Sequence, residues 1–375
     1  MPTKPSSKAD SSVASSAQNA QAQTPLFSLI MPVYGAEKYI HDAVSALLSQ
    51  SFGDFELILV DDASPDASIA RAQEAAGDDP RVRLITNPVN LGASAARNRG
   101  LEVARGAYVA FPDADDITDA TYLQLAAEAI QATGADLIVE GVIEDHYTSQ
   151  GELDYSLTYV PNNAQLHTAQ ELALHVLPLE QLTLLGYPYN KFIKRAVVGS
   201  TRFDEQATLS EDFFFFMEVL PRIQSAVLID QAAYHYARRE SGNLTARFHR
   251  DYWEALSRRM ELLQTFQEAA GLDTQESRGI LGAMYARYLL SAIMQSQDPR
   301  AHKSLKERSQ WLEQVFSSEL AQKLLPQAQS SSPVTQVAAK VLSCRIVPLG
   351  LGLGRGAALV QKAAPSLFSK ARYRR

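Results

Sequence analysis

The sequence has only one cysteine, Cys344, among its 375 residues, and this scarcity excludes two kinds of site. No disulfide can form within the chain, which indicates a reducing compartment. A metal site of the Cys-x-x-Cys type is excluded for the same reason. The sequence also has no run of about 18 or more apolar residues, so it predicts no transmembrane helix.

Two glycine-rich phosphate-binding motifs are missing as well. No Gly-x-Gly-x-x-Gly follows the first apolar strand, and no Gly-x-x-x-x-Gly-Lys-Ser/Thr occurs anywhere. Dehydrogenase-type and P-loop interpretations therefore lack their phosphate-binding element. The segment Met1 to Thr24 has no apolar stretch of the secretory kind, and its Ser, Ala and Gln content predicts a disordered leader over residues 1–24.

The charge is unevenly distributed along the chain. The formal net charge is -7, but residues 340–375 carry eight Lys or Arg and no Asp or Glu, which leaves 27 basic and 42 acidic residues elsewhere. An acidic body with a basic end is a poor candidate for binding nucleic acid. Residues 340–375 are better suited to peripheral contact with an anionic membrane, with a solubilising tail as the alternative.

Short apolar segments alternate with helical patterns between residues 27 and 145. This order predicts βαβ units and a mainly parallel sheet that is buried on both faces. Polar residues collect just after the strands, where open α/β sheets bind their ligands. The expected strands are 27–33, 55–60, 82–85, 107–111 and 137–142.

The alternation stops after about Glu144, and the rest of the chain divides into three parts. A mixed region continues to about residue 245, and a helical pattern then extends from 246 to 326. We expect a linker and a basic tail over 327–375, because four glycines between 350 and 356 disfavour a continuous helix there.

The acidic segment Asp113-Ala114-Asp115-Asp116 follows the fourth expected strand. Three carboxylates in four residues repel one another unless a cation or solvent screens them. Mg²⁺ and Mn²⁺ prefer oxygen ligands and keep positions open for substrate phosphates. A divalent metal site is therefore one interpretation, and the other is an acidic turn in which Asp116 or Asp119 caps the next helix.

Two further polar segments accompany the same sheet edge. Asp61-Asp62 ends the second strand and can accept hydrogen bonds from a base or ribose, or can serve in capping. Arg97 can bind a diphosphate or form a salt bridge with one of the strand-end aspartates. Both roles of Arg97 are compatible, since a structural arginine also changes the acidity of its partners.

Together these segments resemble family 2 of the glycosyltransferases, the inverting group with the GT-A fold. The resemblance depends on the order and spacing of four stretches, and it is strong over about residues 27–145. The four stretches are Ser28-Leu29-Ile30-Met31-Pro32-Val33-Tyr34, Phe55 to Ser64, Asn90-Leu91-Gly92 with Ala96-Arg97-Asn98-Arg99-Gly100, and Gly106 to Phe111 before the acidic segment. It implies a Rossmann-like α/β domain over residues 25–245, with a nucleotide-binding half (27–145) and an acceptor half (146–245), and a helical extension after it.

The resemblance also implies roles for the donor-site residues. Pro32 and Tyr34 would line the base pocket, and Asp61 and Asp62 would contact the base or ribose. Asp113 would support the ribose and the metal, and Asp115 would coordinate Mn²⁺ or Mg²⁺. Asp116 would stand beside the donor sugar or the metal. Arg97, because of its charge, is the further candidate for a contact with the diphosphate.

The catalytic base is expected downstream, in Ser210-Glu211-Asp212, where the family places an acidic pair. We predict Asp212 as the base and Glu211 as a neighbour that contacts the acceptor; the alternative is an N-cap for a helix over 213–219. Lys191, Arg238 or Arg239 can reach a diphosphate or an anionic acceptor, although for Arg239 a solvated basic face is favoured.

The function that follows is metal-dependent transfer of a sugar from a nucleotide-sugar, a UDP-sugar by expectation. The acceptor would be a cell-surface polysaccharide, a teichoic-acid-like polymer or a glycolipid, and the enzyme would act in the cytoplasm or at the inner face of the membrane. Two rivals remain open: a binding module that kept the nucleotide pocket without turnover, and another nucleotide-using α/β enzyme. The sugar, the linkage and the oligomeric state are not determined by the sequence.

Overall fold

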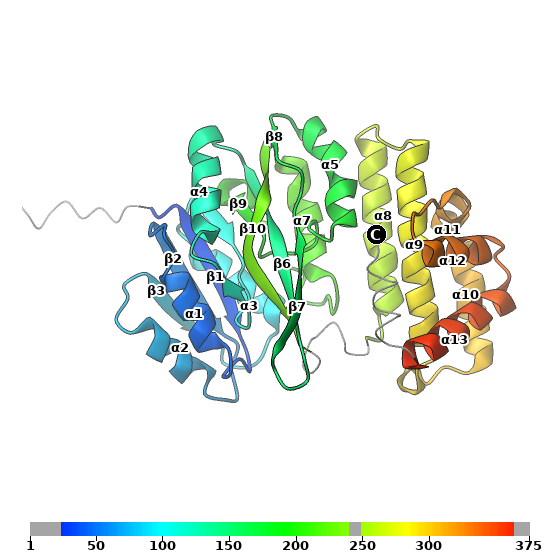
Figure 1. Cartoon of the computed structure of the whole chain (residues 1–375), viewed down its shortest axis with the longest axis horizontal. Helices are drawn as coiled ribbons and strands as arrows, with labels where there is room; N and C mark the ends of the chain where they lie inside the picture. The colour runs from blue at the N-terminus through cyan, green and yellow to red at the C-terminus, as the bar shows by residue number, and fades with distance from the viewer. Residues whose placement is uncertain (1–23, 240–248, 364–375) are drawn as a thin grey trace, which may run out of the picture.

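The computed structural model describes residues 24–239 and 249–363. A ten-stranded sheet forms the centre of this part of the chain, and an all-helical region lies on one side of it (Figure 1). The main strand order is β3-β2-β1-β4-β9-β6-β10-β5, with β7 paired to β6 and β8 to β10. The strands are β1 (Phe27–Val33), β2 (Phe55–Asp61), β3 (Val82–Thr86), β4 (Tyr108–Ala110), β5 (Ile117–Thr118), β6 (Leu137–Tyr147), β7 (Leu153–Tyr159), β8 (Ala164–Leu166), β9 (Lys191–Lys194) and β10 (Ala226–Arg238).

The N-terminal half of the sheet is parallel, as the alternating pattern predicts. β1 pairs in parallel with β2 and β4, and β2 pairs in parallel with β3. All seven residues of β2 are buried, which explains why this strand is a continuous apolar run and not an alternating one. The helices between these strands are α1 (Ile40–Leu48), α2 (Ser68–Ala76), α3 (Ala93–Val103) and α4 (Tyr122–Thr133).

The second half of the sheet mixes both directions. β6 and β10 are parallel over a long register, whereas β9 runs antiparallel between β4 and β6. The short strand β5, directly after the acidic segment, pairs antiparallel with β10. Residues 113–116 therefore lie between β4 and β5, and these two strands fix both ends of the acidic segment. The helices of this half are α5 (Ala169–Gln181), α6 (Arg195–Val198) and α7 (Glu211–Val219).

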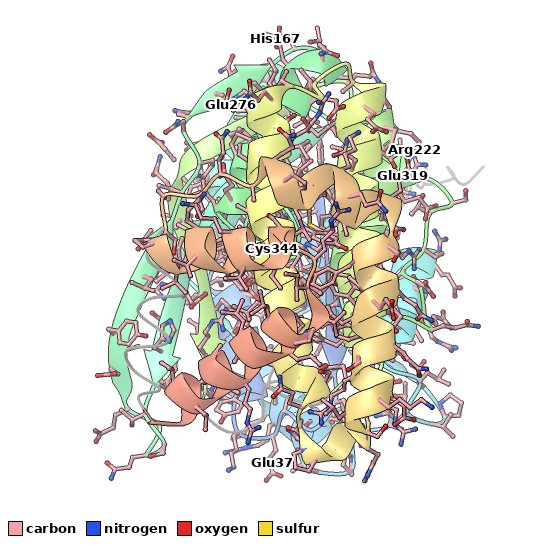
Figure 2. The ribbon with its side chains drawn as sticks, turned by 90° about the vertical axis from the view of Figure 1, so that its right-hand side faces the viewer. Glu37, His167, Arg222, Glu276, Glu319 and Cys344 are labelled. Atoms are coloured by element: carbon pink, nitrogen blue, oxygen red, sulfur yellow. The ribbon has the colours of Figure 1, made fainter. Side chains whose placement is uncertain are left out.

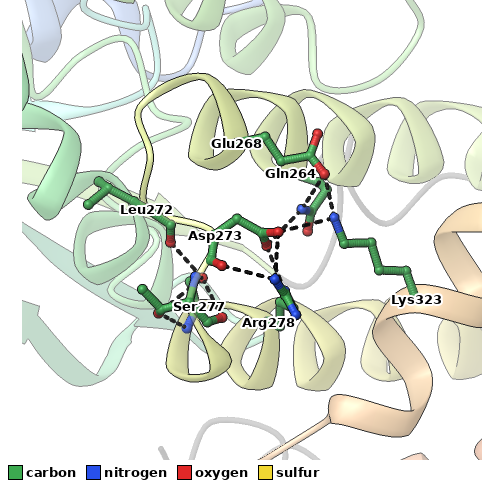
Figure 3. A network of polar contacts seen from close by, with 8 residues as sticks. Gln264, Glu268, Leu272, Asp273, Ser277, Arg278 and Lys323 are labelled. Carbon is green, nitrogen blue, oxygen red and sulfur yellow. Dashed lines mark hydrogen bonds and ion pairs between the residues drawn. The ribbon is translucent and has the colours of Figure 1, made fainter.

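The helical region consists of α8 (Tyr252–Ala269), α9 (Gln275–Ser296), α10 (Leu305–Ser317), α11 (Glu319–Leu324), α12 (Pro333–Ser343) and α13 (Val347–Ala363). Figure 2 shows α12, which ends beside Cys344, and α13, which follows it, lying across the long helices. A polar network ties these elements together (Figure 3): Asp273, in the α8–α9 loop, binds Arg278, Lys323 and Gln264. The hydrogen bond from Arg278 is the main cause that lowers the pKa of Asp273 to about 2.

The helical region is also attached to the α/β half. An ion pair of 2.6 Å joins Arg259 of α8 to the buried Glu180 of α5. The guanidinium of Arg258 lies over the ring of Phe214, which belongs to α7. The middle of α8 is thereby attached to α5 through Arg259 and to α7, the helix that carries the predicted base, through Arg258.

The expectation of a non-helical tail was wrong for residues 347–363, which form the continuous helix α13. Two of its four glycines face a neighbouring helix. A Cβ on Gly354 would stand 2.4 Å from Ile293, and one on Gly350 would stand 2.9 Å from Leu312. Gly352 and Gly356 face open space. Gly350 and Gly354, one turn apart, therefore let α13 approach α9 and α10 closely, and this packing outweighs the low helix propensity of glycine.

Some sequence predictions lie outside the described residues. The leader over 1–23, the predicted boundary at residue 245 and the last basic residues after 363 belong to this group. None of the described helices is long and apolar enough to span a bilayer. Contact of the 340–375 segment with an anionic membrane stays a prediction.

Candidate functional site

The carboxyl ends of β1, β2 and β4 bring the predicted donor-site residues to one edge of the sheet. The Asp62 amide donates to the Val33 carbonyl at 2.9 Å, which holds the ends of β1 and β2 together. Tyr34 follows β1 with 53% of its surface exposed, and Pro32 is half-buried. Gly35 turns the chain with φ of +65°, a conformation that suits glycine. An exposed aromatic ring is thus available beside the edge.

Asp61 and Asp62 both accept hydrogen bonds from the protein. Asp61 accepts from the Ser64 amide at 2.9 Å. Asp62 accepts from the Asn87 side chain and from the amides of Leu91 and Gly92, so its carboxylate holds the loop that leads into α3. The sequence did not suggest that Asp62 holds this loop. Its contact with a base or ribose stays a prediction.

Arg97 joins the two halves of the predicted site. Its Nη2 lies 3.0 Å from Asp113 and its Nη1 lies 2.8 Å from Asp212, with Glu211 at 3.8 Å. Arg97 and Asp212 are 115 positions apart in sequence. The side chain of Arg97 is 5% exposed and its guanidinium also lies over the Phe203 ring. The salt bridge weighed as an alternative for Arg97 is therefore present, and it reaches the predicted base as well as a strand-end aspartate.

The electrostatics of this cluster favour a proton-accepting role for Asp212. Burial raises the pKa of Asp212 to about 8, against the opposing effect of Arg97 and with a further contribution from Glu211 and Asp113. Although burial favours a neutral arginine, the three carboxylates raise the pKa of Arg97 above its ordinary value. Arg97 thus stays charged, while Asp212 changes protonation near neutral pH.

Asp212 stands at the start of α7 but does not cap it. The N-cap position is Ser210, which adopts φ of +64° and makes no side-chain capping bond. A positive φ in a serine is an uncommon and strained conformation. This turn directs Glu211 and Asp212 into the first helical turn, where Asp212 meets Arg97, so the capping alternative is wrong for Asp212.

Asp115 makes a contact that the sequence did not predict. Its carboxylate lies 3.1 Å from Arg239 Nη1, and its carbonyl accepts from Nη2 of the same arginine at 2.8 Å. The guanidinium of Arg239 stacks 3.8 Å over the ring of Tyr39. The solvated basic face favoured for Arg239 was therefore wrong, because the side chain is held between an aspartate and an aromatic ring. Burial and the Asp113 charge raise the pKa of Asp115, and Arg239 opposes them.

Asp116 is more enclosed than its neighbours. It accepts from the Tyr234 hydroxyl at 2.9 Å and from the Ala237 amide at 2.8 Å, and it is 3% exposed. Tyr234 in turn accepts from the Asp113 amide at 2.9 Å, so one hydroxyl bridges both ends of the acidic segment. Neither Asp116 nor Asp119 caps α4, whose N-cap is Thr121, so that alternative is wrong.

Carboxylate oxygens are suitable ligands for a divalent cation. Among the described residues no group of three or more His, Cys, Asp or Glu side chains is arranged to hold a metal. Asp113 and Asp115 nevertheless offer carboxylate oxygens, 27% and 47% exposed, two residues apart on one loop. Such a pair suits Mg²⁺ or Mn²⁺, which take their remaining ligands from substrate phosphates and water.

Lys191 was considered for a diphosphate or an anionic acceptor, and the structure contradicts that role. Its ammonium group is buried and donates to the Leu184 carbonyl, the Tyr187 carbonyl and the Asn190 side chain. Burial lowers its pKa to about 7, against the opposing effect of Asp212 and Glu180. Lys191 is therefore an internal donor that fixes the loop before β9.

Replacing Lys191 by methionine is expected to destabilise the fold without changing nucleotide affinity. The substitution leaves buried acceptors unpaired, which costs about 1–3 kcal/mol. Lys194→Met serves as the matched control, since Lys194 is 42% exposed and pairs with Asp136. Denaturant unfolding and UDP titration of both variants would check this, and a loss of UDP affinity at unchanged stability in Lys191→Met would contradict it.

Comparisons with known proteins bear on the family of this chain. The sequence model described as "Glycosyl transferase family 2" matches residues 28–175. An uncharacterized glycosyltransferase of Haemophilus influenzae is 31% identical over 222 residues, which cover 57% of this chain and 79% of that protein. The uncharacterized glycosyltransferase EpsJ of Bacillus subtilis is 29% identical over 224 residues, 58% of this chain and 62% of that protein.

Two further proteins bear on the fold and on the acceptor. The S. aureus TarS fragment 1-349, solved in complex with UDP-GlcNAc, has a TM-score of 0.63 at 20% identity and covers 90% of this chain and 91% of its own. The minor teichoic acid biosynthesis protein GgaB of Bacillus subtilis is 28% identical over 58% of this chain and 23% of its own length. At 20% identity, the likeness to TarS shows that this chain has the same fold.

Proposed function

Since the chain belongs to glycosyltransferase family 2 and has the GT-A fold, we propose that it is an inverting enzyme that uses a UDP-sugar. Its acceptor is a cell-surface polysaccharide, a teichoic-acid-like polymer or a glycolipid. The complex of TarS with UDP-GlcNAc supports the choice of donor, and the role of GgaB in minor teichoic acid biosynthesis supports the choice of acceptor.

The donor lies along the carboxyl edge of β1, β2 and β4. The exposed ring of Tyr34 packs against the base, with Pro32 below it and Asp61 and Asp62 on the base and ribose side. Arg97 faces the diphosphate through the same guanidinium that holds Asp113. Asp116 is buried, and its hydrogen bonds to Tyr234 and Ala237 hold the part of the loop that faces the donor sugar.

Asp113 and Asp115 would hold the divalent cation. A bound Mn²⁺ or Mg²⁺ offsets the negative charge that develops on the departing diphosphate. Arg239 neutralises Asp115 in the structure described here, so the arginine and the cation compete for one carboxylate. Asp115 would be free to bind a cation only where its contact with Arg239 is open.

The transfer itself takes place at Asp212. The Asp212 carboxylate accepts the proton of the acceptor hydroxyl while that oxygen forms a bond to the anomeric carbon of the sugar. The bond from the anomeric carbon to the diphosphate oxygen breaks on the opposite side, which inverts the configuration. Glu211 contacts the acceptor, and Arg97 orients Asp212 through the 2.8 Å hydrogen bond.

The observation that carries this proposal is the double contact of Arg97. One buried guanidinium binds Asp113, on the donor loop, and Asp212, at the start of α7. A donor-loop carboxylate and a carboxylate with a pKa near 8 are thereby held on two sides of one rigid group. Direct displacement needs a base within reach of the donor, and the Arg97 bridge supports this because it brings the start of α7 next to the donor loop.

Thermal unfolding with a panel of nucleotide-sugars, with and without Mn²⁺, tests the proposed donor. A ligand that binds only the native state at about 100 times its Kd stabilises it by about 2.7 kcal/mol. We expect the largest shift in melting temperature with a UDP-sugar plus Mn²⁺. Tight binding of NAD or a nucleoside triphosphate with no preference for nucleotide-sugars would instead support a different nucleotide-using enzyme.

A further inference from the structure

A cavity of about 350 Å³ lies in the helical region, away from the carboxylate cluster. It is enclosed by the start of α8, the end of α9, the 3-10 helix η3 (Pro299–Ala301) and α10. This volume falls within the range of pockets that bind small molecules or single units of a polymer. No role predicted from the sequence involves these residues.

One wall of the cavity is aromatic. It includes Tyr252, Trp253 and Trp311, and the last two are the only tryptophans of the chain. The rings of Trp253 and Trp311 meet edge to face at 6.1 Å, and Trp253 also packs against Tyr285 at 5.5 Å. These contacts hold the rings in place, so a ligand meets a preorganised surface onto which the C–H face of a sugar or polyol can pack.

The other wall is basic. Arg250, Arg300 and Lys303 line the cavity, and Glu254 is the only carboxylate among the lining residues. Asp298 binds Arg300 through Nε and Nη2 and so fixes the direction of its guanidinium. The Lys303 ammonium stands 5.7 Å from the Trp311 ring centre. Since Asp298 neutralises Arg300, the cations Arg250 and Lys303 stand against Glu254, and this remaining positive charge in a chain of net charge -7 favours an anionic ligand.

The position of the cavity relates it to the proposed catalytic centre. The rings of Phe213 and Phe214, directly after Asp212, pack under Arg259 and Arg258 of α8. Trp253 precedes Arg258 by five residues on the same helix, which corresponds to ~8 Å along its axis. Figure 1 shows the start of α8 and the end of α9 at the same end of the molecule as the carboxyl ends of β1 and β6.

We propose that this cavity is a second binding site, which takes a phosphate-bearing sugar or polyol unit of the acceptor polymer. The aromatic wall packs against the carbon skeleton and the cations bind the phosphodiester, so both parts of one repeating unit are recognised. A chain held here extends along α8 toward Asp212. The proposal rests on the proposed function, because it takes the ligand to be the acceptor of the transfer reaction.

The two tryptophans make the cavity directly observable. Since both lie in its wall, all tryptophan fluorescence of the chain comes from this site. The full chain is titrated, without donor, with a synthetic oligo(glycerol phosphate), with inorganic phosphate at equal phosphate concentration, and with a neutral oligosaccharide of similar length. We expect a saturable fluorescence change with the oligo(glycerol phosphate) that weakens with added salt.

The double variant Arg250→Glu/Lys303→Glu is expected to weaken that binding about tenfold or more, since two attractive contacts become repulsive. The control is Lys306→Glu/Lys340→Glu, which reverses two exposed lysines of the same region that do not line the cavity. The control is expected to bind like the wild type. All four substituted residues are exposed, so both doubles are expected to fold.

Three results would overturn the proposal: no fluorescence change with the oligo(glycerol phosphate), an equal response to inorganic phosphate or to the neutral oligosaccharide, or equal weakening in both double variants. The titration needs no donor and no turnover. A chain that binds the oligomer here but turns over no nucleotide-sugar would leave the cavity proposal standing and refute the proposed function. A chain that transfers sugar to the oligomer but shows no binding at the tryptophans would support the proposed function and refute the cavity proposal.

Discussion

Replacing Asp212 by asparagine is expected to lower the rate of sugar transfer by about 10²–10⁴-fold, the usual contribution of a general base. The asparagine side-chain oxygen can still accept the hydrogen bond from Arg97, so the arrangement around the guanidinium is retained. Binding of the nucleotide-sugar should therefore change little. Steady-state kinetics of UDP release, together with calorimetric titration of UDP, would measure the two quantities separately.

The pH dependence provides a second readout of the same prediction. Burial raises the pKa of Asp212 to about 8, and the carboxyl must be deprotonated to act as a base. The value of kcat/KM for wild type should therefore rise with pH through about 8 and then level off. This rise should be absent from the residual rate of the asparagine variant.

Glu211→Gln is the matched control, because Glu211 is the adjacent acid and lies 3.8 Å from Arg97. We expect it to lose less activity than Asp212→Asn and to keep the rise near pH 8. A larger loss in Glu211→Gln would assign the base to Glu211. Unchanged activity in Asp212→Asn would remove that residue from the mechanism.

Replacing Asp115 by alanine is expected to have a comparably large effect, through the metal. Loss of a cation ligand removes several kcal/mol of stabilisation from the departing diphosphate, which corresponds to a rate loss of about a hundredfold or more. The variant should also lose the increase in UDP affinity that Mn²⁺ gives to wild type. That second readout depends on binding alone and can be measured by calorimetry.

Asp119→Ala is the control for this experiment. Asp119 is a nearby aspartate that directly follows β5, its side chain is 57% exposed and it is not a predicted ligand. It should keep both the rate and the Mn²⁺-dependent affinity of wild type. An Asp115→Ala variant with full activity, or with an unchanged response to Mn²⁺, would show that Asp115 is not a metal ligand.

The sheet could be predicted from the sequence because its signals are local. A buried parallel strand such as β2 is a continuous apolar run, and a polar residue directly after it must lie at the ligand-binding edge. Asp61 and Asp113 were placed on that edge for this reason. The resemblance to a known family then added Asp212, which no local pattern connects to the donor loop.

The partners of charged side chains were harder to predict. Lys191 directly precedes Phe192 and Arg239 lies three residues after Tyr236, and nothing local distinguishes an exposed cation from a buried one. In the fold, Lys191 binds backbone carbonyls and Arg239 binds Asp115, because distant segments meet around each of them. Such contacts depend on tertiary packing and not on spacing along the chain.

The glycines of α13 illustrate the same limit. Helix propensity argues against a helix that contains four of them, yet two lie where a Cβ would collide with α9 or α10. The gain from close packing appears only when the neighbouring helices are in place. A pattern with glycine at every fourth position was the signal that could have suggested a packed helix.

The most direct test of the account is acceptor-dependent release of UDP by the full chain from a panel of UDP-sugars in the presence of Mn²⁺. The account predicts that at least one UDP-sugar is turned over and that turnover requires both Asp115 and Asp212. It also predicts that the sugar appears in the product with inverted anomeric configuration. The chain binding UDP-sugars without releasing UDP, in the presence of polymer and glycolipid acceptors, would contradict the account and support a binding module.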